Sequence, residues 1–378
     1  MSPKMRSIRS TTGCLWRATA GTRSRLAPGH RLGTAPLGKW FLAALTFIAW
    51  SARNVAADDA VYLAAGGNSQ ARAKIPGQIL DYNGRELVLK TPGGEKRYPT
   101  DQVVDVDTEW TPVHLAADEL FDRREYAAAL SKYEESMRGE SRRWVQRRIV
   151  AQMIWCLRNV DQYRRAADLF LALAKDDPAM LYFACIPLRW LPGQPTAELD
   201  KKSREWLASD LPPATLIGAS HLLSTGDRAA IVARLEKLAD SKNARVAALA
   251  RALMWSATFT SATSKQLQQW SRDIEKFPDA VRAGPYFVLG RALLQHQQPE
   301  DAALNLLHVP LLYADDRTLA ATALCEAGHA LEQAKRPDGA ARLYREVLGD
   351  YPDSRPAADA QQRLKDIDAK PVAPAEGD

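Results

Sequence analysis

Residues 321–354 read ATALCEAGHALEQAKRPDGAARLYREVLGDYPDS, and this stretch decides the fold of the chain. Gly328 is small enough for two helices to cross closely there, and Ala340 follows twelve residues later. Tyr344 comes four residues after Ala340. Pro352, which cannot continue a helix, comes eight residues after Tyr344. The spacing predicts a pair of packed helices, the second of which ends at Pro352.

The same internal spacing occurs in three other places along the chain. Each set has a residue at the crossing position, an alanine twelve residues on, and a bulky residue four further. The sets are Ala117, Ala129 and Tyr133; Ile154, Ala166 and Phe170; and Gly290, Ala302 and Leu306. Repetition of one helix pair predicts an array in which each unit buries its apolar stripe against its neighbours.

These spacings resemble those of the tetratricopeptide repeat family, whose period of 34 residues the 321–354 unit matches. The resemblance implies a mainly α fold, a tetratricopeptide-like α-solenoid over residues 111–366. The repeats are clear at 111–178 and 283–354 and degenerate between them. The resemblance also implies a concave face, lined mainly by the first helix of each pair, on which such arrays hold peptides.

The groove-facing positions of that family, mapped onto the first helices, give eight candidate partner-binding residues. They are Arg148, Trp155, Arg158, Phe287, Arg291, Leu294, His329 and Glu332. Trp155 and Arg158 combine an aromatic ring with a cation, which is a composition found in interface hot spots. We therefore expect a protein or peptide partner on this face.

Between residues 74 and 110 the pattern changes to the alternation that is typical of β-strands. Strands are expected around Ile79, around Leu87 and Leu89, at residues 95–98 and at 103–106. Asn83–Gly84 is a strong signal for a type I′ hairpin turn. Residues 58–73 are interpreted as a linker, and residues 367–378 as a disordered tail.

The 74–110 segment resembles Sm-like and SH3-like small barrels in the order of its turn and core residues. The residues that carry this order are Gly77, Ile79, Asp81, Gly84, Leu87, Leu89, Gly94, Pro99 and Val103. The resemblance implies a small all-β barrel-like unit ahead of the helical array. The loop residues that hold RNA in Sm-like proteins are not recognisable here, so no nucleic-acid partner is expected.

Residues 1–57 have the features of a secretory signal peptide. They hold nine basic residues and no acidic residue, and an apolar core, WFLAALTFIAW, spans residues 40–50. Cleavage after Ala57 would place Val55 and Ala57 in the two small pockets that a signal peptidase reads. A helix that spans a membrane needs roughly 20 apolar residues, whereas this apolar core has eleven. The sequence therefore favours an exported, periplasmic or cell-envelope protein without a transmembrane span after cleavage. An uncleaved anchor at residues 40–52 and an organellar transit peptide are the alternatives.

Removal of the leader changes the net charge. The whole chain has 51 basic and 45 acidic residues, and subtracting the nine basic residues of the leader leaves 42 against 45, a net charge of −3. A nearly neutral mature chain gives no electrostatic reason to expect a nucleic-acid partner. Residues 141–148, SRRWVQRR, are the most basic segment, either a site for an acidic partner or, preferably, a solvated helix face.

The sequence has no specific catalytic motif, so we expect no enzyme and no cofactor. Cys325 and His329 lie four residues apart, a workable metal geometry, but no second ligand pair is in view and no metal site is predicted. Cys156, Cys185 and Cys325 are expected to be buried apolar-like residues.

Two functions follow as hypotheses. In the first, the protein is an exported non-catalytic scaffold or adaptor that binds a protein or peptide through the concave face of the array. In the second, the β unit binds a cell-envelope glycan or polymer, and the array is a spacer.

Overall fold

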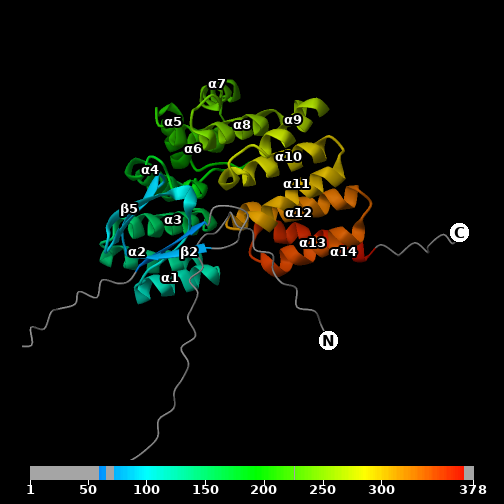
Figure 1. The fold of residues 1–378 in the computed structure, drawn as a ribbon. Helices are drawn as coiled ribbons and strands as arrows, with labels where there is room; N and C mark the ends of the chain where they lie inside the picture. The colour runs from blue at the N-terminus through cyan, green and yellow to red at the C-terminus, as the bar shows by residue number, and fades with distance from the viewer. Residues whose placement is uncertain (1–58, 65–71, 225, 370–378) are drawn as a thin grey trace, which may run out of the picture.

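The computed structural model of the chain describes residues 59–64, 72–224 and 226–369. The described residues form six β-strands followed by fourteen α-helices that pack in neighbouring pairs (Figure 1). This confirms the predicted fold class, a mainly helical repeat array preceded by a small β unit. The predicted leader and most of the predicted tail lie outside the described residues.

The β unit consists of two three-stranded antiparallel sheets. One has the order β2-β1-β6, with β1 at Ala60–Ala64, β2 at Arg72–Pro76 and β6 at Val103–Asp107. The other has the order β3-β4-β5, with β3 at Gln78–Tyr82, β4 at Glu86–Thr91 and β5 at Gly94–Pro99. The strands expected after residue 77 are therefore present. Their buried apolar residues, among them Val61, Leu87 and Val106, form the core between the sheets.

The β unit begins earlier in the chain than the sequence predicted. Strand β1 lies inside the segment that was interpreted as a linker, and Val61 in it is fully buried. Asp59 fixes its start, because its side chain accepts hydrogen bonds from the backbone N–H of Ile79 (2.8 Å) and from the Thr108 hydroxyl. Its five residues, AVYLA, are all hydrophobic, so they lack the alternation of apolar and polar residues by which the later strands were predicted.

The turn at Asn83–Gly84 closes a hairpin, but it is not the predicted type I′ turn. That turn needs positive φ at both central residues, and among the described glycines only Gly94 has one. The Asn83 side chain instead accepts hydrogen bonds from the backbone N–H groups of Arg85 and Glu86. Gly84 serves packing, since a Cβ atom there would lie 2.4 Å from the backbone of Ala179.

The helices have the following bounds: α1 Pro112–Asp122, α2 Tyr126–Gly139, α3 Arg143–Asn159, α4 Tyr163–Asp176, α5 Ala197–Ala208, α6 Pro212–Leu222, α7 Arg228–Ala239, α8 Ala244–Thr258, α9 Ser264–Ile274, α10 Ala283–Gln295, α11 Pro299–Leu312, α12 Arg317–Gln333, α13 Pro337–Asp350 and α14 Arg355–Asp368.

Four of the helix pairs, α1–α2, α3–α4, α10–α11 and α12–α13, are joined by one and the same turn. In each, a residue with left-handed backbone precedes the second helix by two positions: Arg124, Asp161, Gln297 and Lys335. The next backbone N–H donates back to the carbonyl of a leucine five residues earlier: Leu120, Leu157, Leu293 and Leu331. This 6→1 bond is the Schellman helix stop. Its repetition marks these four pairs as equivalent units.

Within these pairs, the predicted crossing residues pack as expected. A Cβ atom on Gly328 would lie 2.4 Å from the ring of Tyr344, and one on Gly290 would lie 2.6 Å from Leu306. Ala117 is fully buried and so is Ile154. The residue spacing seen in the sequence therefore corresponds to direct contacts between the paired helices.

The array curves until its first and last repeats meet (Figure 1). The guanidinium of Arg158, at the end of α3, binds the carboxylate of Asp316, the residue that caps the start of α12. Asn159 donates to the carbonyl of Asp315 (3.2 Å) and accepts from the backbone N–H of Arg317 (3.2 Å). Arg124, in the α1–α2 turn, donates to the carbonyl of Asp350 at the end of α13. We call this contact region the seam.

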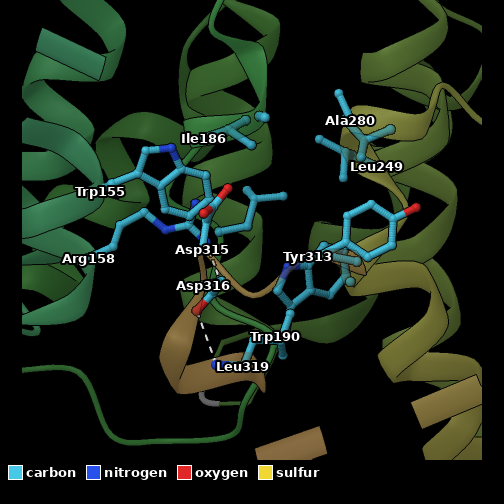
Figure 2. A pocket seen from close by; sticks show the side chains of 15 residues that line it. Trp155, Arg158, Ile186, Trp190, Leu249, Ala280, Tyr313, Asp315, Asp316 and Leu319 are labelled. Carbon is cyan, nitrogen blue, oxygen red and sulfur yellow. Dashed lines mark hydrogen bonds and ion pairs between the residues drawn. The ribbon is translucent and has the colours of Figure 1, made fainter. Parts of the chain in front are cut away.

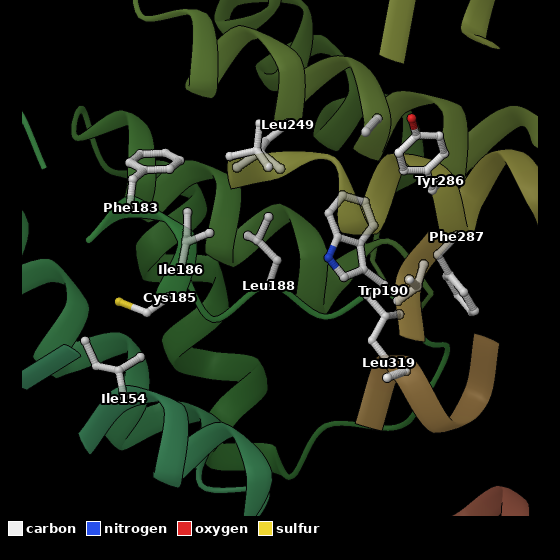
Figure 3. Packing of buried hydrophobic residues seen from close by; sticks show 14 of the residues in the cluster. Ile154, Phe183, Cys185, Ile186, Leu188, Trp190, Leu249, Tyr286, Phe287 and Leu319 are labelled. Carbon is white, nitrogen blue, oxygen red and sulfur yellow. The ribbon is translucent and has the colours of Figure 1, made fainter. Parts of the chain in front are cut away.

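The chain's own residues 183–191 fill the inside of the curve (Figure 3). This segment has no helix beyond a short 3-10 turn at Phe183–Cys185. Its apolar side chains Ile186, Leu188 and Trp190 are buried. Trp190 packs so closely on α10 that a Cβ atom on Gly284 would lie 2.0 Å from its ring. An internal segment therefore occupies the inner face, where the resemblance predicted a peptide.

The basic segment at 141–148 joins the β unit to the array. Its arginines pair with the chain's own carboxylates: Arg142–Glu140, Arg143–Asp176, Arg147–Asp81 and Arg148–Asp118. Arg147 also binds the carbonyl of Tyr82 and the carboxylate of Asp176, so it links β3 to α4. The predicted solvated face is therefore wrong for Arg147 and Arg148, which are buried, whereas Arg143 is exposed as that prediction requires.

Candidate functional site

A small cavity lies where the inner segment meets α3, α8, α10 and α12 (Figure 2). It measures about 70 Å³ and is lined mainly by apolar side chains, including Trp155, Leu188 and Leu319. Ligand pockets usually measure about 300–1,000 Å³. The inner cavity is therefore too small for a peptide or a substrate of ordinary size.

The polar side of this cavity is a buried ion pair. Arg158 is 5% exposed, its guanidinium lies 4.2 Å from the centre of the Trp155 ring, and it binds Asp316. Asp316 also caps α12, because its carboxylate accepts from the backbone N–H of Leu319 (3.1 Å). Two further guanidinium nitrogens of Arg158 lack a hydrogen-bond partner among the described residues. The pair therefore holds the seam together and is closed to solvent.

A much larger cleft, of about 760 Å³, opens at the seam. We call it the seam cleft. Its walls are the α1–α2 turn, the end of α3, the start of α12 and the α13–α14 connection. The lining residues lie at 123–128, 159–160, 317–318 and 349–354. Segments that are more than 200 residues apart in sequence thus build one site of peptide-binding size.

Two arginines give the seam cleft its chemistry. Arg124 and Arg317 both donate to the backbone carbonyl of Asp350, and Arg317 lies 4.4 Å from the centre of the Tyr351 ring. Burial, and then the neighbouring charge of Arg124, lower the pKa of Arg317. In the part of the chain that the structure describes, the acceptor of both guanidinium groups is this carbonyl and not a carboxylate. Two positive charges therefore share one neutral acceptor.

All eight residues predicted from the array's groove make internal contacts. Arg148, Arg158 and Phe287 are buried. Arg291 pairs with Glu326, His329 with Asp359, and Glu332 with Arg363. Trp155 and Leu294 are half-buried against the core. Trp155 and Arg158 share a cavity, the small inner one.

Sequence reasoning missed Arg124 and Arg317 because nothing in the local pattern distinguishes them. Arg124 is one of four consecutive charged residues before α2, and Arg317 is an ordinary first residue of a helix. Only closure of the array brings them together. The one available signal is the recurring turn, which places Arg124 in a left-handed conformation at the tip of its helix pair.

The three described cysteines are free, and their burial confirms the prediction that they are buried, apolar-like residues. Burial raises the pKa of Cys156, Cys185 and Cys325 to about 12 in each case. A thiol with such a pKa remains protonated at neutral pH and is a poor nucleophile.

Comparison with known proteins gives no assignment: no protein-family model matches the chain, and no curated protein is significantly similar to it. Among the described residues, none of the helices is both long enough and apolar enough to cross a membrane.

Proposed function

We propose that this protein is an exported, non-catalytic adaptor with a tetratricopeptide-like array that binds a protein or peptide segment in the seam cleft. The partner class is the one that the sequence suggested, but the binding surface is the seam cleft and not the concave face of the array. The inner face is filled by residues 183–191, whereas the seam cleft has the volume that a peptide segment needs.

The observation that carries this proposal is the convergence of Arg124 and Arg317 on one backbone carbonyl. A carboxylate from a partner would accept charge-assisted hydrogen bonds from both guanidinium groups and relieve their mutual repulsion. The ring of Tyr351 and the side chain of Tyr126 supply apolar surface beside them. These features favour an acidic side chain or a free C-terminal carboxylate as the anchor of the bound segment.

Export is part of the same proposal and rests on the leader. Cleavage after Ala57 would leave every described residue in the mature protein, since the first of them is Asp59. Asp59 is buried and hydrogen-bonded within the β unit. Sequencing the N-terminus of the protein secreted by its native organism tests this. The expected mature N-terminus is Asp58, and an intact leader would contradict cleavage.

Peptide binding is tested by selecting short peptides with free C-termini against the purified protein and measuring their affinities by titration calorimetry. Charge-assisted hydrogen bonds contribute about 1.5–3 kcal/mol each. The double variant R124Q/R317Q should therefore lose at least about tenfold in affinity. Arg123→Gln is the matched control, because Arg123 borders the same cleft but already pairs with Glu119 and Glu125.

If the selected peptides bind the double variant as tightly as the wild type, the seam cleft is not the site. If no peptide is selected while the protein retains envelope polymer, the second hypothesis takes precedence. Deletion of residues 74–110 does not test that hypothesis cleanly. The β unit is fixed to the array through Arg147, and its removal would leave that guanidinium without Asp81.

A further inference from the structure

Three potential metal ligands converge between α12 and α14. Cys325 and His329 lie one turn apart on α12, and Asp359 reaches them from α14. Sγ of Cys325 lies 3.8 Å from Nε2 of His329 and 3.6 Å from Oδ2 of Asp359. The His329 nitrogen and the Asp359 oxygen are 2.8 Å apart. Sequence reasoning saw the first two residues and missed the third, which is 30 residues further on.

The arrangement is not that of a nucleophile with a relay. In a cysteine–histidine–aspartate relay, the thiol and the carboxylate contact different nitrogens of the imidazole ring. Here both Sγ of Cys325 and Oδ2 of Asp359 face the same nitrogen, Nε2. Three donor atoms that point at one another suit a cation placed between them.

The distances fit a tetrahedral ion after a small adjustment. Zinc bonds of about 2.3 Å to sulfur and about 2.0–2.2 Å to nitrogen or oxygen imply ligand separations of roughly 3.3–3.6 Å. The two separations that involve Sγ of Cys325 are already close to this range. The His329–Asp359 contact would open by about 0.5 Å. Because the Asp359 side chain is half exposed, an ion can enter from solvent, and water can take the fourth position.

The surrounding charges hold the ligands in place. Nε of Arg363 lies 3.4 Å from Oδ1 of Asp359, which leaves the other oxygen free to face His329. Nη1 of Arg363 is in turn 3.4 Å from Glu332. Glu326, on the Cys325 side, is paired with Arg291. Outer partners of this kind orient metal-binding carboxylates.

We propose that Cys325, His329 and Asp359 bind one zinc-class divalent metal ion, which fixes the terminal helix α14 to α12. The ion would replace the thiol proton, because a coordinating thiol is deprotonated. A terminal helix covers the open end of a repeat array, and its stability limits that of the end repeat. The site would therefore act as a structural clamp between these two helices.

The test is titration of the purified, chelator-treated mature protein, without a histidine tag, with Co²⁺ and then Zn²⁺. We expect one equivalent per chain, a thiolate-to-cobalt charge-transfer absorption, and a rise in Tm with Zn²⁺. The variant C325S should lose the charge-transfer absorption, since Cys156 and Cys185 lie elsewhere in the core. Asp359→Asn should weaken binding at least about tenfold.

Asp366→Asn is the matched control, because Asp366 lies on the same helix and bonds only Gln362 in the described contacts. It should leave metal affinity unchanged. The proposal is overturned if the wild type takes up no stoichiometric metal at micromolar concentration. It is also overturned if D359N and H329Q bind as tightly as the wild type.

Discussion

Several buried polar side chains of this protein depend on neighbours that are distant in sequence. His221, on α6, is 1% exposed, and neither of its ring nitrogens has a hydrogen-bond partner among the described residues. Its ring lies edge-on to Tyr163, 5.4 Å away, and beside Trp206. Burial, with the charge of Arg189, lowers the pKa of His221 to about 4. The imidazole is therefore neutral in the folded protein at physiological pH.

This histidine makes stability depend on pH. The unfolded chain binds a proton at His221 below about pH 6.5, whereas the folded chain does so only near pH 4, so acid favours unfolding between these values. The loss reaches about 2 kcal/mol at pH 5. His221→Leu should remove this part of the pH dependence. Urea unfolding at pH 7.5 and pH 5 measures it, and an unchanged stability difference between variant and wild type at the two pH values would contradict the assigned environment.

At the scale of the helix pair, close contact explains why small residues recur at one position. Gly328 on α12 faces Tyr344 on α13, and the Tyr344 hydroxyl in turn donates to Glu332 on α12. The Tyr344 ring is fully buried and its hydroxyl is fixed by this hydrogen bond, so the ring cannot move aside for a larger neighbour. The pair is thus fixed at a distance that only glycine permits.

Gly328→Ala should destabilise the protein by about 1–3 kcal/mol, because its Cβ atom would lie 2.4 Å from the Tyr344 ring. Gly349→Ala is the matched control on α13, where a Cβ atom meets no atom within 4 Å. That change should stabilise by about 0.5–1 kcal/mol through helix propensity. Opposite signs in thermal unfolding are the expected result, and equal effects would contradict the packing.

Elements were predictable where one residue spacing determines one contact. The Gly328–Ala340–Tyr344 spacing predicted a helix pair because those residues touch each other within that pair. Strand β1 was not predictable, since it owes its place to Asp59 and to pairing with β6, which follows more than 40 residues later. The seam cleft was not predictable for the same reason. Arg124 and Arg317 become neighbours only through the curvature summed over all repeats.

At the scale of the whole molecule, the ends of the array are joined by a buried ion pair. Arg158→Met would leave the buried Asp316 carboxylate without its partner, which costs about 3–5 kcal/mol. Arg164→Met is the control, because the Arg164–Glu198 pair is exposed and contributes less than about 1 kcal/mol. Urea unfolding compares the two. Similar losses in both variants would show that the seam does not hold the array closed.

The central claim is that a partner segment binds where the two ends of the array meet. Hydrogen–deuterium exchange of the protein with and without a selected peptide tests it most directly, because it reports every backbone segment at once. Binding in the seam cleft should slow exchange at residues 123–128 and 349–354 in the complex and leave the β unit unchanged. Protection confined to the β unit or to the outer helix faces, with none at the seam, would contradict it.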